Sequence, residues 1–172
     1  MQLVLLRHAP AETRDPSRWP DDSQRPLTGN GRRVAREVAR GLKAVPVRAA
    51  RLRTSPAVRC EDTAKITARA FNHSASVDVW PELAFGATPE QLLARLQRST
   101  RANGSFEVLV GHEPALGRLA SLLLFGEPVP SIRHKRGGAA LIETPRKPAA
   151  GSGKLEWVLT RRQLAKLGNG KP

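Results

Sequence analysis

The first strand that the sequence predicts is a run of four aliphatic residues, Leu3–Leu6, which ends in Arg7 and His8. An uninterrupted aliphatic run of this length is typical of a parallel strand that is buried on both faces of its sheet. In open α/β sheets, functional side chains lie just beyond the carboxyl ends of such strands. The cation of Arg7 is expected to lower the pKa of His8 below its ordinary value of about 6.5. A neutral imidazole is nucleophilic, so His8 is a candidate for covalent catalysis.

A second strongly apolar strand, predicted at 106–110, is followed by Gly111, His112, Glu113 and Pro114. It repeats the opening order of an aliphatic run followed by a histidine, and the proline then begins a helix over 115–125. One histidine after a strand is commonly just a polar strand end. Two strands that deliver histidines to the same edge of one sheet form a constellation, and we interpret His8 and His112 as parts of one site.

Helices and strands alternate along most of the remaining chain. The expected helices cover 29–44, capped by Thr28, a segment that starts at Ser55-Pro56, a segment from the Thr88 capping box to about 99, and a short segment at the end of the chain. The expected strands are 49–54, 76–80 and a late pair at 139–143 and 155–159. This order predicts a single three-layer α/β/α domain with a mostly parallel central sheet over residues 1–165. Residues 166–172 are expected to form a flexible tail.

Arg59 falls in the first turn of the helix that is predicted to begin at Ser55-Pro56. The amino terminus of a helix carries free amide donors and a partial positive charge, both of which favour phosphate. An arginine at this place adds a planar pair of donors for the same anion. The alternative is a surface arginine without a role in binding.

The chain carries 29 lysines and arginines against 15 acidic residues, a net charge of +14. Such a surface attracts anions, which a phosphorylated protein, a polyanion or a nucleic acid could supply. The arginines are spread along the chain without interleaved aromatic residues that would stack bases, so nucleic acid is not the expected partner. We interpret the basic run at 133–136 as a solvated charge run, or as a segment that leans over a phosphate site.

Other classes of protein are excluded or disfavoured by what the sequence contains. The single cysteine, Cys60, excludes an internal disulfide. Cysteine and histidine clusters with zinc spacing, a phosphate-binding glycine-rich loop and long apolar runs are all missing from the sequence. We therefore expect a cytoplasmic protein without membrane contact.

Five segments, taken together and in this order, resemble the histidine phosphatase superfamily. They are Leu-Arg-His-Ala at 6–9, Arg-Pro-Leu-Thr at 25–28, Thr-Ser-Pro-Ala-Val-Arg-Cys-Glu-Asp-Thr-Ala at 54–64, Pro-Glu-Leu at 81–83 and Val-Gly-His-Glu-Pro at 110–114. The short length and the Arg-Pro-Leu-Thr segment resemble the small phosphohistidine phosphatases of the SixA type. Ala9 stands where the superfamily usually has glycine, a variant that the small branch also shows. The resemblance implies a fold like that of phosphoglycerate mutase.

The resemblance also implies roles for individual residues. His8 would be the nucleophile that accepts the phosphoryl group. The oxygens of that group would be bound by Arg7, Arg59 and His112, with Arg25 as a further phosphate contact. Two guanidinium groups and a histidine supply the positioning and charge neutralisation that phosphoryl transfer needs, so neither a cofactor nor a metal is expected.

The identity of the substrate depends on whether a general acid protonates the leaving group. In larger relatives a carboxylate in an insertion has this role, and the chain lacks such an insertion. Glu82 is the best remaining candidate, followed by Glu12 and Asp15. A weak or missing acid favours phosphohistidine on a signalling or phosphotransfer protein. The alternatives are a phosphomonoesterase that acts on small sugar or nucleotide phosphates, and a non-catalytic module that binds phosphate or polyanions.

Overall fold

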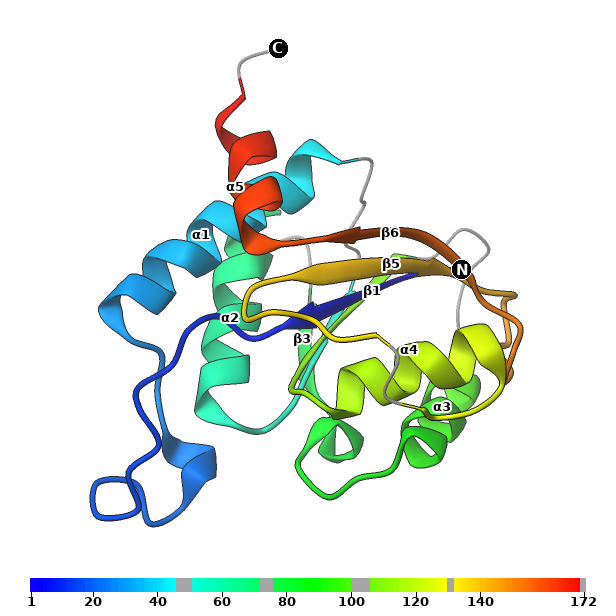
Figure 1. The fold of residues 1–172 in the computed structure, drawn as a ribbon, viewed down its shortest axis with the longest axis horizontal. Coiled ribbons are helices and arrows are strands. Elements are labelled where there is room, and N and C mark those ends of the chain that lie inside the picture. The colour runs from blue at the N-terminus through cyan, green and yellow to red at the C-terminus, as the bar shows by residue number, and fades with distance from the viewer. Residues whose placement is uncertain (46–50, 72–75, 100–105, 130–131, 171–172) are drawn as a thin grey trace.

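The computed structural model describes residues 1–45, 51–71, 76–99, 106–129 and 132–170 of the 172-residue chain. Within these residues, six strands form one sheet in the order β3-β2-β4-β1-β5-β6 (Figure 1). Their bounds are β1 Gln2–Arg7, β2 Arg51–Thr54, β3 Ser76–Val79, β4 Phe106–Gly111, β5 Ala139–Glu143 and β6 Lys154–Leu159. The first four strands are parallel to one another, whereas β5 runs antiparallel to β1 and to β6. The predicted mostly parallel sheet is confirmed.

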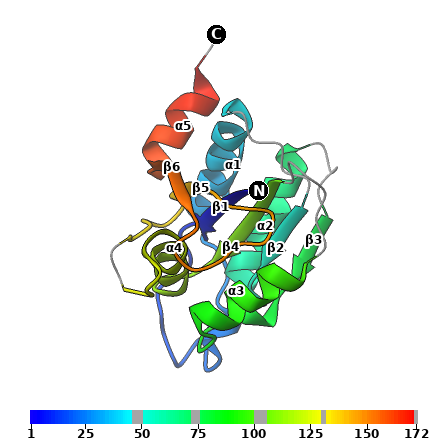
Figure 2. The ribbon, with the colours of Figure 1, turned by 90° about the vertical axis from the view of Figure 1, so that its right-hand side faces the viewer.

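Helices cover both faces of the sheet (Figure 2). The described helices are α1 Gly29–Ala44, α2 Val58–Ala70, α3 Pro89–Arg98, α4 Ala115–Phe125 and α5 Arg161–Asn169. Side chains of α1, α2 and α5 belong to one buried apolar cluster, and those of α3 and α4 belong to a second cluster on the opposite face. The three-layer α/β/α architecture is therefore confirmed.

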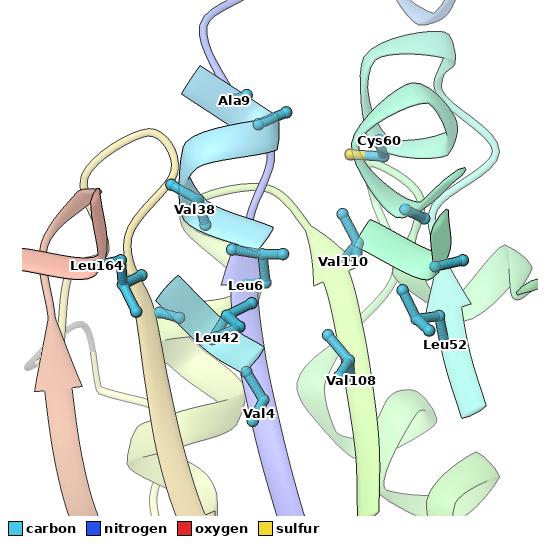
Figure 3. Close-up of a cluster of buried hydrophobic side chains, with 14 of the residues drawn as sticks. Val4, Leu6, Ala9, Val38, Leu42, Leu52, Cys60, Val108, Val110 and Leu164 are labelled. Carbon is cyan, nitrogen blue, oxygen red and sulfur yellow. The ribbon is translucent and has the colours of Figure 1, made fainter. Parts of the chain in front are cut away.

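Strand β1 contributes to both clusters because successive side chains of a strand point to opposite faces. Val4 and Leu6 pack against the α1, α2 and α5 layer, whereas Leu3 and Leu5 pack against α3 and α4. All four side chains are fully buried, as the uninterrupted aliphatic run predicts. Figure 3 shows how the first cluster is filled from the sheet and from three helices, by Val4, Leu6, Leu52, Val108 and Val110 together with Val38, Leu42, Cys60 and Leu164.

The predicted caps are present on two helices. The Thr28 side chain accepts a hydrogen bond from the Gly31 N–H at the start of α1, and Thr88 forms a reciprocal capping box with Gln91 at the start of α3. One predicted start is wrong. Helix α2 begins at Val58, two residues later than a helix capped by Ser55 would begin, and its N-cap is Ala57. Arg59 still lies in the first turn.

The final helix packs along α1. A Cβ atom placed on Gly41 would lie 2.0 Å from the carbonyl oxygen of Leu164, so the close approach of α1 and α5 requires a glycine at this position. Residues 166–169, expected to begin a tail, belong to α5, and residues 171–172 lie outside the described part. The flexibility of this end stays a prediction. In the described part of the chain, no helix is long and apolar enough to span a membrane.

Candidate active site

The two histidines predicted from separate strands meet at one edge of the sheet. Strands β1 and β4 are neighbours, and their register pairs Arg7 with Gly111. The N–H of His8 donates a hydrogen bond to the carbonyl oxygen of Gly111 (3.0 Å). The ring centroids of His8 and His112 are 5.3 Å apart, with the rings inclined at 64°. Both side chains are buried, so the parallel pairing of two apolar strands brings two imidazole rings together in a desolvated site.

The protonation state of His8 follows from its surroundings. Its Nδ1 lies 2.7 Å from the carbonyl oxygen of Ala9. A carbonyl oxygen only accepts hydrogen bonds, so Nδ1 carries the hydrogen and the neutral ring keeps a lone pair on Nε2. Burial is the main cause that lowers the pKa of His8 to about 3, and the charges of Arg59 and Arg7 act in the same direction. The predicted direction is confirmed, although burial contributes more than the neighbouring cation.

His112 is held by residues from two other segments. Its Nε2 lies 2.8 Å from the hydroxyl oxygen of Ser55 and 3.4 Å from the sulfur of Cys60. The ring of Phe85 stacks on the imidazole at a centroid distance of 4.1 Å. Burial lowers the pKa of His112 to about 3, and the nearby His8 lowers it as well. His112 is therefore neutral at neutral pH and fixed in orientation.

Asp22 joins two of the arginines that were predicted to bind phosphate. Arg59 is completely buried and donates to both the carbonyl oxygen of Asp22 (2.6 Å) and its carboxylate (2.8 Å). Arg25 donates from Nε to the other carboxylate oxygen (2.9 Å) and from Nη1 to the carbonyl oxygen of Glu12 (2.7 Å). Burial alone would raise the pKa of Asp22, but Arg25 and Arg59 outweigh it and lower that pKa. Asp22 is thus an ionised partner for both guanidinium groups.

Arg7 and Arg59 keep donors that the protein does not satisfy. The Nη1 of Arg7 donates to the carbonyl oxygen of His134 (2.7 Å). The Nε–H groups of Arg7 and Arg59 are buried and have no hydrogen-bond partner among the described residues. Buried donors are normally paired, and a guanidinium group matches the geometry of a phosphoryl group. Two unsatisfied donors therefore belong to arginines whose charges act on His8.

The acidic residues considered as proton donors lie in different surroundings. Glu82 follows β3 in the short 3₁₀ helix Pro81–Leu83, and its carboxylate lies 3.9 Å from the Nε of Arg95 in α3. Asp15 accepts hydrogen bonds from Ser17 in the loop after β1, and Glu12 contacts Arg25 through its backbone. Within the described residues, none of these three carboxylates contacts His8 or His112.

A hollow of about 410 Å³ opens beside His112. Phe85, Arg118 and Pro128 line it together with the start of α3 and the Glu113-Pro114 turn. The hollow is large enough to hold part of a substrate next to the histidine pair. In the part of the chain that the structure describes, no group of three or more histidine, cysteine or acidic side chains is placed to hold a metal ion.

Comparison with known proteins identifies the family of the chain. The family model of the histidine phosphatase superfamily (branch 1) matches residues 3–97, which is more than half of the chain. The chain belongs to the histidine phosphatase superfamily. Among individual relatives, the chain is 29% identical to the phosphohistidine phosphatase SixA of Escherichia coli strain K12 over 160 residues, covering 93% of this chain and 94% of that protein. It is 32% identical over 142 residues to an uncharacterized protein of Picosynechococcus, covering 80% and 82%.

Solved structures extend the comparison to the fold. The structure of the protein histidine phosphatase SixA complexed with tungstate superposes on this structure with a TM-score of 0.81 and 29% identity, over 95% of this chain and 99% of that chain. The alpha-ribazole phosphatase of Shigella flexneri matches with a TM-score of 0.64 and 18% identity, over 94% and 97%. The second likeness concerns the fold alone. The chain therefore has the fold of the superfamily over nearly its whole length.

Several residues of the candidate site are not predicted from the sequence. Ser55 was interpreted as a helix cap, and His134 as part of a charge run. Phe85 lies in a turn without any periodic pattern that could indicate its contact with His112. Asp22 precedes Arg25 by three residues, and an acid at this spacing from a candidate phosphate ligand is the one available signal.

Proposed function

We propose that this protein dephosphorylates phosphohistidine on a signalling or phosphotransfer protein, through a phosphohistidine intermediate on its own His8. Membership of the superfamily supports a phosphatase activity. The observation that carries the proposal is the state of His8, which keeps a free lone pair on Nε2 near the guanidinium groups of Arg7 and Arg59, whose buried Nε–H donors have no partner among the described residues. A nucleophile and anion-binding donors are the two parts that metal-independent phosphoryl transfer needs.

In the first step, Nε2 of His8 attacks the phosphorus atom of the substrate. The bond between phosphorus and the substrate nitrogen breaks as the bond to Nε2 forms. The charge on the transferring oxygens is stabilised by the Nε–H groups of Arg7 and Arg59 and by the ring of His112. The phosphorylated ring of His8 carries a positive charge, and its Nδ1–H stays hydrogen-bonded to the carbonyl oxygen of Ala9. Arg25 is the further phosphate contact. It shares the carboxylate of Asp22 with Arg59 and so lies next to the other phosphate ligands.

In the second step, a water molecule attacks the phosphorus atom from the side opposite to Nε2. The bond between phosphorus and Nε2 breaks, inorganic phosphate takes up the oxygen and the protons of water, and His8 returns to the neutral ring. Because burial holds the pKa of His8 at about 3, the neutral form is the stable resting state at neutral pH. The cycle therefore starts again without a separate deprotonation of the nucleophile.

The carboxylates of the site favour a substrate that needs no general acid. Asp22 and Glu113 both have lowered pKa values and are hydrogen-bonded, so at neutral pH neither carries a proton for an alkoxide leaving group. The imidazole of a phosphohistidine leaves as a neutral ring once its second nitrogen is protonated, which happens readily near neutral pH. The SixA relative, described as a phosphohistidine phosphatase, points to the same substrate class.

A second candidate function is hydrolysis of small phosphate esters. The hollow of about 410 Å³ beside His112 favours it, because a space of that size can hold a sugar or a nucleoside next to the site. This activity requires a proton donor, for which Glu82 remains the candidate named from the sequence. A Glu82→Gln variant that loses activity on esters would support the second function, and full activity would remove Glu82 as the acid.

The deciding measurement is phosphate release in the presence of EDTA from three substrates: a histidine-phosphorylated protein, a phosphoserine peptide and an aryl phosphate. Faster release from phosphohistidine than from phosphoserine is expected. Comparable rates on all three would favour the small-ester function, and no release from any of them would favour a binding module. Loss of activity in EDTA that zinc or magnesium restores would contradict the metal-independent mechanism.

Replacement of the nucleophile provides the matched test. His8→Ala is expected to abolish turnover while the protein still folds and still binds inorganic phosphate through the arginines. Rapid quenching into alkaline denaturant should trap a phosphoenzyme in the wild type and none in the variant, and this phosphoenzyme should be stable in alkali and lost in acid. A His8→Ala variant with full activity would contradict the covalent mechanism.

A further inference from the structure

The segment 132–137 lies against the carboxyl end of β1, next to the proposed nucleophile. The N–H of Arg7 donates to the carbonyl oxygen of Gly138 (3.0 Å), and the N–H of Gly137 lies within hydrogen-bond distance of the carbonyl oxygens of Arg7 and His8 (3.2 and 3.1 Å). Gly137 has a φ of +75°, which favours glycine at this turn. The backbone of the segment is therefore fixed to the residues that the mechanism uses.

His134 anchors the middle of the segment to Glu113, in the turn before α4. Its side chain is buried, and its backbone N–H and its Nδ1–H both donate to Oε1 of Glu113 (2.7 and 2.8 Å). Its carbonyl oxygen accepts the hydrogen bond from Nη1 of Arg7 (2.7 Å). The prediction that 133–136 is a solvated charge run is thus wrong for His134, because its ring is buried and bonded to the partly buried carboxylate of Glu113.

The neighbours of His134 in the sequence are exposed, in contrast to His134 itself. Arg133, Lys135 and Arg136 are exposed, and none of them forms an ion pair with a carboxylate of the described residues. Arg133 also lines a hollow of about 490 Å³ together with Arg7 and Glu113. We name residues 133–136 the basic loop. Its buried histidine and its exposed cations form a rigid element that presents unpaired positive charge beside the phosphate site.

We propose that the basic loop is a docking element for acidic residues that flank the phosphohistidine on the substrate protein. This inference rests on the proposed function. A phosphorylated side chain that reaches His8 brings its surrounding protein surface against 133–136, because the loop is hydrogen-bonded to the end of β1. Acidic groups on that surface would complement three unpaired cations. A nucleic acid is disfavoured as the partner, since the loop contains no aromatic side chain on which bases could stack.

The expected consequence is that substrates with acidic residues around the phosphohistidine associate with the protein faster than neutral ones. Complementary charges at an exposed rim raise association rates by about tenfold or more at low ionic strength, and salt screens the effect. None of the loop's exposed side chains forms a hydrogen bond with His8 or Arg7 among the described residues. The loop should therefore act on kcat/KM for acidic substrates, while the turnover of neutral substrates stays unchanged.

The test uses two synthetic phosphohistidine peptides and two variants of the full chain. One peptide carries aspartate and glutamate around the phosphohistidine, and the other carries asparagine and glutamine at the same positions. The variant R133Q/R136Q removes two charges from the basic loop. The control R146Q/K147Q removes two exposed charges near Thr144, whose N–H donates to the carbonyl oxygen of Met1 at the opposite end of β1.

The wild type and the control are expected to favour the acidic peptide by about tenfold in kcat/KM at low salt, and to lose this preference at high salt. R133Q/R136Q should lose the preference at every salt concentration and hydrolyse the neutral peptide as the wild type does. Equal rates on both peptides in the wild type, or a preference that survives in R133Q/R136Q, would overturn the proposal. The proposal would also be overturned if single-stranded DNA bound the loop and inhibited the wild type while the two peptides were hydrolysed at equal rates. Failure to hydrolyse either peptide would instead contradict the proposed function.

Discussion

At the scale of single residues, the chemistry of this site depends on how Arg59 is held before a substrate arrives. Its guanidinium group is completely buried, and Asp22 is the carboxylate that compensates its charge. The charge of Asp22 is shared with Arg25, so one acidic side chain organises two predicted phosphate ligands. A buried cation that loses its partner destabilises the fold until another anion takes its place.

Asp22→Asn is therefore expected to lower the free energy of unfolding by about 2 kcal/mol, because the amide can still accept one hydrogen bond but carries no charge. Inorganic phosphate should stabilise the variant more than the wild type, since the anion restores the missing charge. Urea unfolding with and without phosphate measures both effects. Asp21→Asn, which removes the same charge from a carboxylate bonded to Ser23, serves as the control and should respond to phosphate like the wild type. Equal responses in all three proteins would show that Asp22 does not hold the charge of Arg59.

At the scale of elements, the buried pair of His134 and Glu113 fixes the basic loop to the turn before α4 and thereby fixes Arg7. Burial alone would raise the pKa of Glu113, but its hydrogen bonds with His134 outweigh this effect and lower the pKa. The ring of His134 therefore supports a buried, ionised carboxylate. Removal of one partner leaves the other unsatisfied, whereas removal of both does not.

His134→Leu should lower the free energy of unfolding by about 2 kcal/mol, because the partly buried Glu113 carboxylate loses its ring donor. It should also reduce kcat/KM on acidic and neutral substrates alike, since the backbone carbonyl that accepts from Arg7 is no longer held in place by the bond between the His134 ring and Glu113. The double variant E113L/H134L is expected to recover stability but not activity. A double-mutant cycle from urea unfolding and kinetics checks both, and stability losses that simply add would argue against a coupled pair. An effect confined to acidic substrates would instead place His134 with the docking side chains.

The elements also show which parts of the molecule can be predicted from sequence. The aliphatic runs that end in His8 and His112 predict buried parallel strands, and the threonine caps predict where helices begin, because both depend on local patterns. The counter-charge of Arg59 could not be predicted in this way. Asp22 reaches it from a proline-rich loop that has no periodicity, across 37 positions of sequence. Likewise, Arg133 and His134 belong to one basic run in the sequence, although the side chain of Arg133 is exposed and that of His134 is buried.

At the scale of the whole molecule, the two neutral histidines of the candidate site make the free energy of unfolding depend on pH. Burial is the main cause that lowers the pKa of His8 and of His112 to about 3, against about 6.5 in the unfolded chain. Below pH 6.5 the unfolded chain therefore binds protons that the folded protein does not accept until about pH 3. The stability that neutral histidines contribute is lost as pH falls through this window, by up to about 1.4 kcal/mol per pH unit for each histidine.

The carboxylates Asp22 and Glu113, whose pKa values are also lowered, contribute stability that is lost only at lower pH, once the unfolded chain begins to protonate its acidic groups near pH 4.5. The interval between pH 6.5 and 5 therefore isolates the histidines. Urea unfolding should show a decline over this interval in the wild type, and a decline about half as steep in His8→Asn, because one of the two protons has been removed. A wild-type profile that stays flat to pH 5 would mean that the folded protein protonates both rings as readily as the unfolded chain does. In that case His8 would not be held neutral by burial, and the nucleophile would need another base to activate it.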